Sequence, residues 1–349
     1  MKIGITSDIH LKKGFQERFN ALKNILIKIK KNNIKNLIIA GDLFDIESED
    51  YSDFNEISSK FKDISFYVIP GNHDSKIKQR FFSEENVFII DEVSMRIFDN
   101  TKFLFVPYIP DKTMDEVLTI FFNKNEIPER WCLIGHCDYI TKKTELNPYE
   151  EGVYMPLTWN VLNRFNPSKV FLGHLHKLSE FGKVVYTGSP VSIDITEEGI
   201  RRFLIYDTEN GKIEYHPVDT DVIYFSHTIL VFPFDEINYI KNAVDEMIKG
   251  WGIDDDKIDK VILRLKVNGF SYDLKKTKEE ILERIKEKGI KIYKDEIEFN
   301  VKGVIEKERI KIFKRVKEMI EKTNLDKKFF YCDKDDIIKK AMELIFSYD

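Results

Sequence analysis

The sequence predicts an α/β (α+β) fold, a four-layer β-sandwich in which two sheets pack face to face with helices outside. Three observations predict it. Short apolar runs alternate with amphipathic segments over residues 1–135, as in strands connected through helices. Predicted strands dominate from residue 87 onward. After about residue 220 the pattern changes to that of a separate, small α+β domain.

The first predicted strands are continuous apolar runs, which is the pattern of strands covered on both faces. They lie at residues 2–7, 36–40 and 65–69. The helix between the first two carries an apolar face made by Phe19, Leu22, Leu26 and Ile29. A second helix is predicted at residues 53–63.

Seven more strands are predicted before residue 217. They lie at residues 87–90, 102–106, 131–134, 169–172, 184–187, 203–206 and 212–216. So many strands in one domain favour two packed sheets over a single open sheet.

The remaining chain predicts a small domain followed by two helices. Its strands are expected at residues 228–232, 260–267 and 290–299, and its helices at 235–249 and 275–288. The predicted domains are therefore 1–220, 221–303 and 304–349. The helix at residues 306–322 carries an apolar stripe, which either packs on its own domain or binds a partner.

Composition indicates a globular, cytoplasmic protein that does not enter a membrane. The chain has 349 residues, and no apolar run approaches the roughly 18 to 20 residues of a membrane span. Its three cysteines form no CxxC pattern and no disulfide framework, as expected in a reducing compartment. The net charge of −5 argues against binding nucleic acid by bulk charge, although local basic patches stay possible.

Five of the seven histidines directly follow predicted strands. They are His10 in DIH, His73 in GNHD, His136 in GH, and His174 and His176 in GHLH. Another predicted strand is followed by the motif GDLFD, which contains the two carboxylates Asp42 and Asp45. Ligands collect at the carboxyl ends of strands in sheet-based enzymes, so these side chains are candidates for one site.

The residue types in these motifs predict a transition-metal site. Asp8 and His10 are separated by one residue, as are His174 and His176, so each pair leaves its strand on one side. Imidazole, carboxylate and amide oxygen together suit Mn, Fe, Zn or Ni. Seven candidate ligands exceed the needs of one ion. Two ions roughly 3.5 to 4 Å apart that share a carboxylate would use them all.

In this order, the motifs resemble the signature of the calcineurin-like metallophosphoesterases over roughly residues 1–215. The resemblance implies that two divalent ions bind, with Mn²⁺ the first expectation and Fe, Zn, Ni or Mg the alternatives. It implies that Asp8, His10, Asp42 and His176 hold one ion, and that Asp42, Asn72, His136 and His174 hold the other. It also implies that His73 is the catalytic acid and that Asp45 orients it.

Each candidate also has a structural interpretation. Asp8, Asp42 and Asp74 could serve turn chemistry after a strand, and for Asp74 we favour this interpretation. His216 and His227 are isolated, and we expect them to be ordinary surface or core residues. Turn chemistry does not explain five histidines at five matching positions, so the metal-site interpretation is preferred.

Longer stretches resemble one branch of the family, the SbcD and meiotic-recombination-eleven DNA-repair nucleases. They are SDIHLKKGFQERFNALKNIL, FLFVPYIPD, EGVYMPLTWNVLNRFNPSKVFLGHLHK and VVYTGSPVSID. The resemblance implies a two-metal DNA nuclease, acting as an exonuclease on double-stranded ends and an endonuclease on single strands. It further implies a homodimer, a DNA-capping domain at 221–303, and a segment at 304–349 that binds the coiled coil of an SbcC-type ATPase. Many archaeal and eukaryotic members carry His where this chain has Asp45, so the metal preference and cleavage polarity could differ.

Two other functions stay open. One is a stand-alone phosphodiesterase or phosphatase that acts on small phosphoesters or nucleotides. The other is a binding scaffold without turnover, against which the intact His73 and Asp45 argue. DNA contacts by Lys12, Lys13 and Arg18 are possible, but a solvated helix face explains these residues equally well. The apolar face that begins with Phe19 could serve a dimer, although core packing is the preferred interpretation.

Overall fold

The structure, a computed structural model, describes residues 1–46, 50–141, 152–233, 236–304, 307–323 and 334–346. It divides into two compact units. Unit 1 comprises Met1–Ile193 and Ile200–Asp221, and unit 2 comprises Asp194–Gly199 and Val222–Asp349. Within the described ranges, no helix combines the length and the apolar character needed to cross a membrane.

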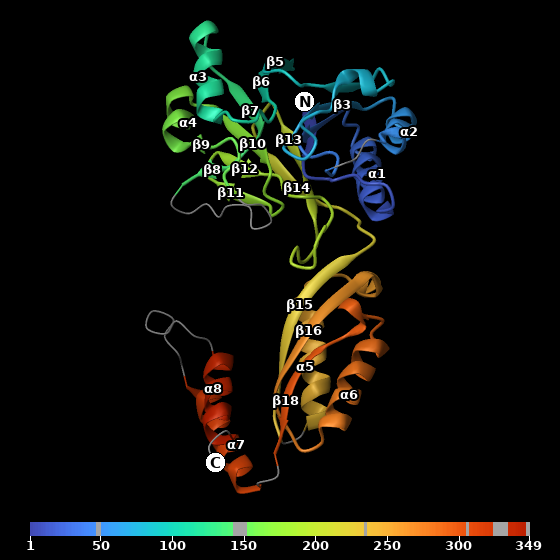
Figure 1. Cartoon of the computed structure of the whole chain (residues 1–349), viewed down its shortest axis with the longest axis vertical. Helices are drawn as coiled ribbons and strands as arrows, with labels where there is room; N and C mark the ends of the chain where they lie inside the picture. The colour runs from blue at the N-terminus through green and yellow to red at the C-terminus, as the bar shows by residue number, and fades with distance from the viewer. Residues whose placement is uncertain (47–49, 142–151, 234–235, 305–306, 324–333, 347–349) are drawn as a thin grey trace. The chain divides into compact units, whose positions relative to one another are not determined.

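Unit 1 contains two six-stranded mixed sheets (Figure 1). The first has the order β14 (Ile213–Pro217), β13 (Arg202–Asp207), β1 (Lys2–Thr6), β2 (Asn36–Ala40), β3 (Ser65–Ile69) and β4 (Val87–Ile89). The second has the order β11 (Ser179–Phe181), β12 (Val184–Tyr186), β10 (Lys169–Gly173), β7 (Trp131–His136), β6 (Thr101–Val106) and β5 (Ser94–Phe98). Strands β1 to β4 run parallel, as do β6, β7, β10 and β12, so their carboxyl ends gather at one edge of each sheet.

Three apolar cores make unit 1 a four-layer structure. The core between the sheets joins residues such as Ile5 and Ile38 of the first sheet to Phe105 and Phe171 of the second. Helices α1 (Gln16–Lys31) and α2 (Ser52–Lys60) cover the outer face of the first sheet, and α3 (Met114–Lys124) and α4 (Trp159–Phe165) cover that of the second. A short parallel pair, β8 (Tyr139–Ile140) and β9 (Leu157–Thr158), lies beside the second sheet's outer core. The predicted sandwich with helices outside is confirmed.

The apolar face of α1 belongs to the core. Leu22 and Leu26 are completely buried, and Phe19 is nearly so. Core packing, the preferred interpretation of this face, is therefore confirmed, and these side chains are not free for a dimer contact.

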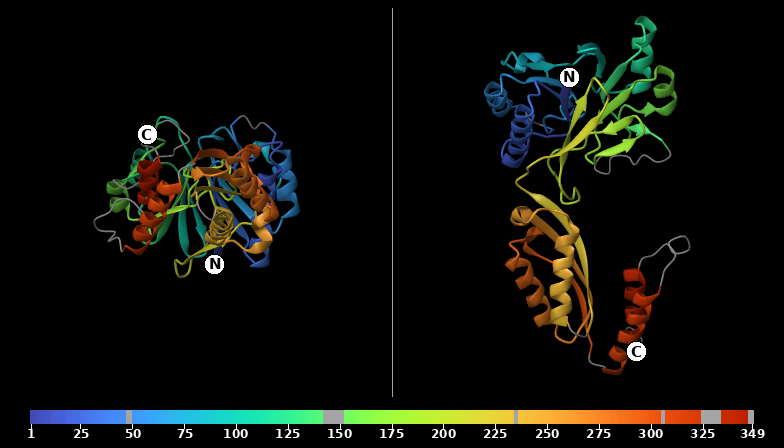
Figure 2. Two further views of the ribbon diagram at one scale, coloured as in Figure 1. Left: turned by 90° about the horizontal axis from the view of Figure 1, so that it is seen from below. Right: turned by 180° about the vertical axis from the view of Figure 1, so that it is seen from behind.

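Unit 2 is built on a parallel sheet, visible from two sides in Figures 1 and 2. Its strands are β15 (Ile223–Val231), β16 (Val261–Ser271), β17 (Lys291–Ile292) and β18 (Glu298–Gly303). Helices α5 (Glu236–Gly250) and α6 (Leu274–Glu287) share an apolar core with one face of this sheet, to which Val244, Ile281 and Leu263 contribute.

The two last helices, α7 (Lys307–Lys322) and α8 (Lys334–Phe346), pack on unit 2 itself. Phe313 is completely buried, and its ring stacks on Phe232 with 5.7 Å between the ring centroids. The apolar stripe of α7 is therefore largely covered by its own unit. Ile312 and Met319 lie outside this contact and are 56% and 64% exposed.

Several strands differ from the sequence prediction, and two of these differences have a clear physical reason. β5 was not predicted, because it is an edge strand whose Ile97 faces outward and breaks the alternation of buried residues. β16 runs past Asn268 and Gly269, a pair that normally indicates a turn. Gly269 has φ +133°, and a Cβ there would lie 2.1 Å from the carbonyl oxygen of Val231, so this strand position excludes any side chain.

Candidate metal centre

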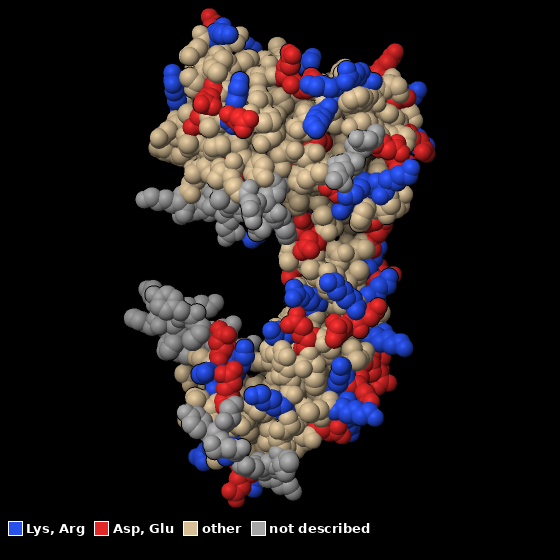
Figure 3. Space-filling view, in the orientation of Figure 1, with Lys and Arg blue, Asp and Glu red and all other residues tan. Residues whose placement is uncertain are grey.

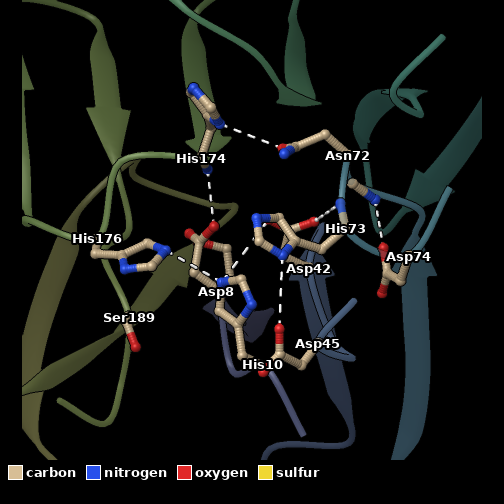
Figure 4. A network of polar contacts seen from close by, with 12 residues as sticks. Asp8, His10, Asp42, Asp45, Asn72, His73, Asp74, His174, His176 and Ser189 are labelled. Atoms are coloured by element: carbon tan, nitrogen blue, oxygen red, sulfur yellow. Dashed lines mark hydrogen bonds and ion pairs between the residues drawn. The ribbon is translucent and has the colours of Figure 1, made fainter. Parts of the chain in front are cut away.

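The predicted ligands converge at the carboxyl ends of five strands. Asp8 and His10 follow β1, Asp42 follows β2, Asn72 and His73 follow β3, and His174 and His176 follow β10 (Figure 4). His136 ends β7. Because β1, β2 and β3 are parallel neighbours, as are β7 and β10, the topology brings these loops to the same rim of the sandwich. The structure thus brings all seven predicted ligands together.

The loops that carry these side chains adopt an uncommon backbone conformation. Asp8, His10 and Asp42 have φ values of 52°, 51° and 51°, and His174 has 95°. Residues other than glycine rarely adopt positive φ, and such conformations concentrate at functional sites. Backbone hydrogen bonds hold two of the loops together, since the Asp8 and His10 amides donate to the carbonyl oxygens of Gly41 and Asp42.

Two glycines allow the close approach of the ligands. A Cβ on Gly41 would lie 2.1 Å from Nδ1 of His136, and one on Gly71 would lie 2.1 Å from Oδ1 of Asp42. These distances are far shorter than any real contact, so side chains at either position would displace a predicted ligand. The glycines of GDLFD and GNHD are therefore part of the site's construction.

The first group of ligand atoms comes from Asp8, His10 and His176, which lie within 4.8 Å of one another. The Nε2 atoms of His10 and His176 are only 3.1 Å apart. Two imidazole nitrogens that face the same point supply the lone pairs that a cation needs.

The second group surrounds His136. Its Nε2 lies 2.8 Å from Oδ1 of Asn72 and 3.2 Å from Oδ2 of Asp42, and Nδ1 of His174 lies 3.3 Å from the same Asn72 oxygen. Oδ2 of Asp42 also lies 3.8 Å from Nε2 of His10. The Asp42 carboxylate therefore stands between the two groups, which is the position expected of a bridging ligand.

The charges of this buried cluster suit a cation. Burial lowers the pKa of His10 to about 3, so its imidazole is neutral, the form that binds metals. Burial opposes the charged form of His136, but the carboxylates of Asp42 and Asp8 outweigh it and raise the pKa of His136 to about 9. Burial likewise opposes ionisation of Asp42, yet His136 outweighs it and holds the pKa of Asp42 below its usual range. The buried carboxylates of this cluster thus require positive charge nearby. His136 supplies it here, and bound cations would supply it as well.

His73 differs from the ligands His10 and His136 because it reaches the surface. Its side chain is 17% exposed, whereas those of His10 and His136 are 3% and 0% exposed. Nδ1 of His73 lies 3.7 Å from Oδ1 of Asp45, and its backbone amide donates to Oδ1 of Asp42. His73 also lies within 4.8 Å of ligand atoms of His10 and Asp42, so the acid position directly adjoins the predicted metal positions.

Arg18 holds the Asp45 carboxylate in place. Its Nη1 donates to Oδ2 of Asp45 at 3.1 Å and to the carbonyl oxygen of His10 at 2.6 Å, and Arg18 is only 6% exposed. Burial opposes ionisation of Asp45, but His73 and Arg18 outweigh it and lower the pKa of Asp45. This burial opposes a contact between Arg18 and a DNA phosphate, because the guanidinium lies against Asp45.

Asp74 occupies the structural role expected of it. Its Oδ1 accepts a hydrogen bond from the Gly71 amide at 2.7 Å, and its Oδ2 accepts one from the Phe44 amide at 3.1 Å. The side chain therefore joins the GNHD loop to the GDLFD loop.

Comparison with known proteins identifies the family. A model of the family described as calcineurin-like phosphoesterase matches residues 1–228. The chain belongs to this family. Exonuclease subunit 1 of Enterobacteria phage T4 is 25% identical to this phosphoesterase over 292 residues, which covers 76% of this chain and 80% of the phage protein.

Two solved structures resemble parts of the phosphoesterase. A dimetal phosphatase from Danio rerio is 10% identical and has a TM-score of 0.42, with 62% of this chain and 96% of that chain covered. A purple acid phosphatase from yellow lupin (Lupinus luteus) is 8% identical and has a TM-score of 0.36, with 62% and 52% covered.

One residue of this phosphoesterase's site was missed by the sequence analysis. Asp138 is 1% exposed, and its Oδ1 lies 3.5 Å from Nε2 of His174, while its Oδ2 accepts a hydrogen bond from the Tyr154 amide at 2.7 Å. A proton on Nε2 shared with Asp138 would leave the lone pair of Nδ1 directed at the Asn72 side of the site. The signal was present in the sequence, since Asp138 follows His136 at the same spacing as in DIH and HLH.

Replacing Asp138 with asparagine is expected to weaken binding of the ion nearest His174 by about 10- to 100-fold, because the imidazole loses the carboxylate that fixes its tautomer. Titration of the metal-free protein with Mn²⁺ would then separate one tight from one weak site. Asp115→Asn is the matched control, because Asp115 bonds to Thr158 outside the cluster. Two sites of unchanged affinity in the Asp138 variant would exclude this role.

Proposed function

We propose that the chain is a metal-dependent DNA nuclease, acting as an exonuclease on double-stranded ends and an endonuclease on single strands. The observation that carries this proposal is the likeness to the phage exonuclease subunit. This likeness covers 76% of the chain, which is a longer part than residues 1–228 matched by the family model. The likeness therefore extends into unit 2. A second unit shared with an exonuclease subunit supports a DNA substrate over a small phosphoester.

The proposed metal assignment follows the two ligand groups. Asp8, His10, Asp42 and His176 would hold one ion, and Asp42, Asn72, His136 and His174 the other. Mixed nitrogen and oxygen ligands suit Mn, Fe, Zn or Ni. The resemblance to the nuclease branch makes Mn²⁺ the first expectation, and Mg is a further alternative. When bound, such an ion pair activates water and stabilises the charge that develops on the phosphoryl oxygens.

His73 is proposed to act as the catalytic acid. Its imidazole is 17% exposed, so it can reach a scissile phosphate and protonate the leaving oxygen. Asp45 would orient the ring and stabilise its protonated form, while Arg18 fixes Asp45. This arrangement serves turnover, which supports an enzyme rather than a binding scaffold.

Surface charge neither adds to nor opposes this proposal. On the face in Figure 3, lysine and arginine side chains are mixed with aspartate and glutamate over both units. Lys13, one of the candidate DNA contacts, lies 3.3 Å from Asp50, and Lys12 lies 3.5 Å from Asp45. We therefore expect DNA contacts to be local and close to the metal centre.

The domain and partner assignments are also proposals. Residues 221–303 would cap the DNA, and residues 304–349 would bind the coiled coil of an SbcC-type ATPase in a homodimeric complex. Exposed apolar side chains on the two last helices support the second assignment. They are Ile312, Met319 and Leu344. This surface is smaller than the sequence suggested, because Phe313 is committed to unit 2.

A substrate comparison tests the proposed function. The Mn²⁺-loaded protein is expected to shorten linear double-stranded DNA from its ends and to open circular single-stranded DNA, and chelation should abolish both activities. Hydrolysis of p-nitrophenyl phosphate or mononucleotides without cleavage of either DNA would instead favour a stand-alone phosphatase or phosphodiesterase.

A further inference from the structure

A large cavity opens beside the proposed catalytic acid. Its volume is about 900 Å³, within the range of ligand-binding sites. Asp45, Asn72 and His73 line one part, and Tyr51 and Phe81 line another. A phosphodiester placed at His73 would therefore have its neighbouring groups inside this cavity.

The aromatic wall of the cavity is a stacked pair. The rings of Tyr51 and Phe81 lie 5.5 Å apart at an interplanar angle of 19°. Tyr51 is in turn backed by buried rings, with centroid distances of 4.7 Å to Phe44 and 5.4 Å to Phe82. Phe81 is the outer member of the stack and is 37% exposed.

The backbone beneath Phe81 is fixed before any ligand binds. Phe81 ends the short 3-10 helix Gln79–Phe81. The Gln79 side chain donates to the carbonyl oxygen of Val87 at 2.9 Å and accepts from the Ile89 amide at 2.8 Å, which ties the turn to β4. The side-chain amide of Asn55 also donates a hydrogen bond to the carbonyl oxygen of Phe81 at 3.4 Å. An aromatic surface held in this way loses little entropy on binding.

The chemistry around the wall favours a nucleobase over an apolar group. Lys76 and the amide of Asn55 line the same cavity, and the guanidinium of Arg80 lies 5.1 Å from the Phe81 ring. Aromatic faces bordered by cations and amides bind bases by stacking and hold the adjoining phosphates by charge. An alkyl chain would offer no charge to Lys76 and no flat face to the Phe81 ring.

We propose that Tyr51 and Phe81 form a platform on which a nucleobase adjacent to the scissile phosphate stacks. The inference rests on the proposed function, because it requires that the scissile phosphate belong to a nucleic acid strand. It deepens that function by predicting that the enzyme recognises an unstacked base, as in a single strand or an opened end. Sequence-tolerant cleavage is expected, since every base presents an aromatic face.

The test compares single-stranded oligonucleotides that carry either a base or an abasic residue on each side of one cleavage position. The wild-type enzyme is expected to show a kcat/KM for the base-containing strand that is about 5- to 150-fold higher. In Phe81→Ala this ratio should fall to near one, and Phe81→Trp should preserve it. Trp159→Ala removes an aromatic residue that is 60% exposed on α4 and should leave the ratio at the wild-type value.

The outcomes separate the two proposals. If the wild-type enzyme cleaves oligonucleotides but Phe81→Ala keeps the wild-type ratio, the stacking platform is wrong and the nuclease proposal stands. If the wild-type enzyme cleaves no oligonucleotide but hydrolyses p-nitrophenyl phosphate, both proposals fail. Phe81→Leu retains the apolar volume without the aromatic face, so it gives the same decision if the alanine variant folds poorly.

Discussion

An Asp42→Asn variant is expected to bind fewer than two Mn²⁺ ions per chain and to lose about 1000-fold or more in the rate of phosphodiester hydrolysis. Oδ2 of Asp42 lies 3.2 Å from Nε2 of His136 and 3.8 Å from Nε2 of His10. Asparagine keeps the size of the side chain but removes the charge that both ions would share. A loss of about 4 kcal/mol in transition-state stabilisation corresponds to this rate factor.

Metal content distinguishes this effect from simple unfolding. Mass spectrometry of the dialysed protein should find two ions in the wild type and at most one in Asp42→Asn, and Mn²⁺ should raise the Tm of the wild type more than that of the variant. Asp115→Asn, which changes a carboxylate bonded to Thr158 on another part of unit 1, should behave like the wild type. If Asp42→Asn retained two ions of wild-type affinity, Asp42 would not be the bridge.

A His73→Asn variant is expected to keep both ions and to lose about 10²- to 10⁴-fold in kcat on DNA. The loss follows from the removal of a partly exposed imidazole whose Nδ1 lies 3.7 Å from the Asp45 carboxylate. The loss in rate should be smaller on a thymidine p-nitrophenyl phosphodiester, because the nitrophenolate group leaves without needing a proton. Single-turnover rates on the two substrates would measure this difference.

Two results would contradict the acid role of His73. Equal losses on both substrates would show that its contribution does not depend on the leaving group. Loss of an ion would show that His73 is a ligand, which is a real alternative because its ring adjoins His10 and Asp42. His216→Asn, a histidine on β14 outside the cluster, should leave both rates unchanged.

The convergence of the site could be predicted because it depends on local patterns and topology. The apolar runs predicted the positions of the strands. Motifs that follow neighbouring parallel strands lie at the same edge of the sheet. Asp8, Asp42 and His174 lie together for this reason, although nothing in the sequence predicted their positive φ values. Hydrogen bonds between loops that are distant along the chain accompany those conformations, from the Asp8 amide to the Gly41 carbonyl oxygen and from the His174 amide to Oδ1 of Asp8.

Features that depend on tertiary packing were harder to predict. Arg18 was expected either on a solvated helix face or near a DNA phosphate, yet it lies buried against Asp45 and the carbonyl oxygen of His10. The spacing of His136 and Asp138 gave a local signal, but the relation of Asp138 to His174 appears only once β7 and β10 pair. Tyr51 and Phe81 are separated by thirty positions that include β3, so their stacking has no local signature.

Anomalous diffraction from crystals grown with Mn²⁺ tests the central claim most directly. We predict two manganese peaks roughly 3.5 to 4 Å apart, with the Asp42 carboxylate in contact with both. His10 and His176 should contact one peak, and Asn72, His136 and His174 the other. A single peak, or two peaks that Asp42 does not join, would contradict the two-metal centre on which the proposed nuclease depends.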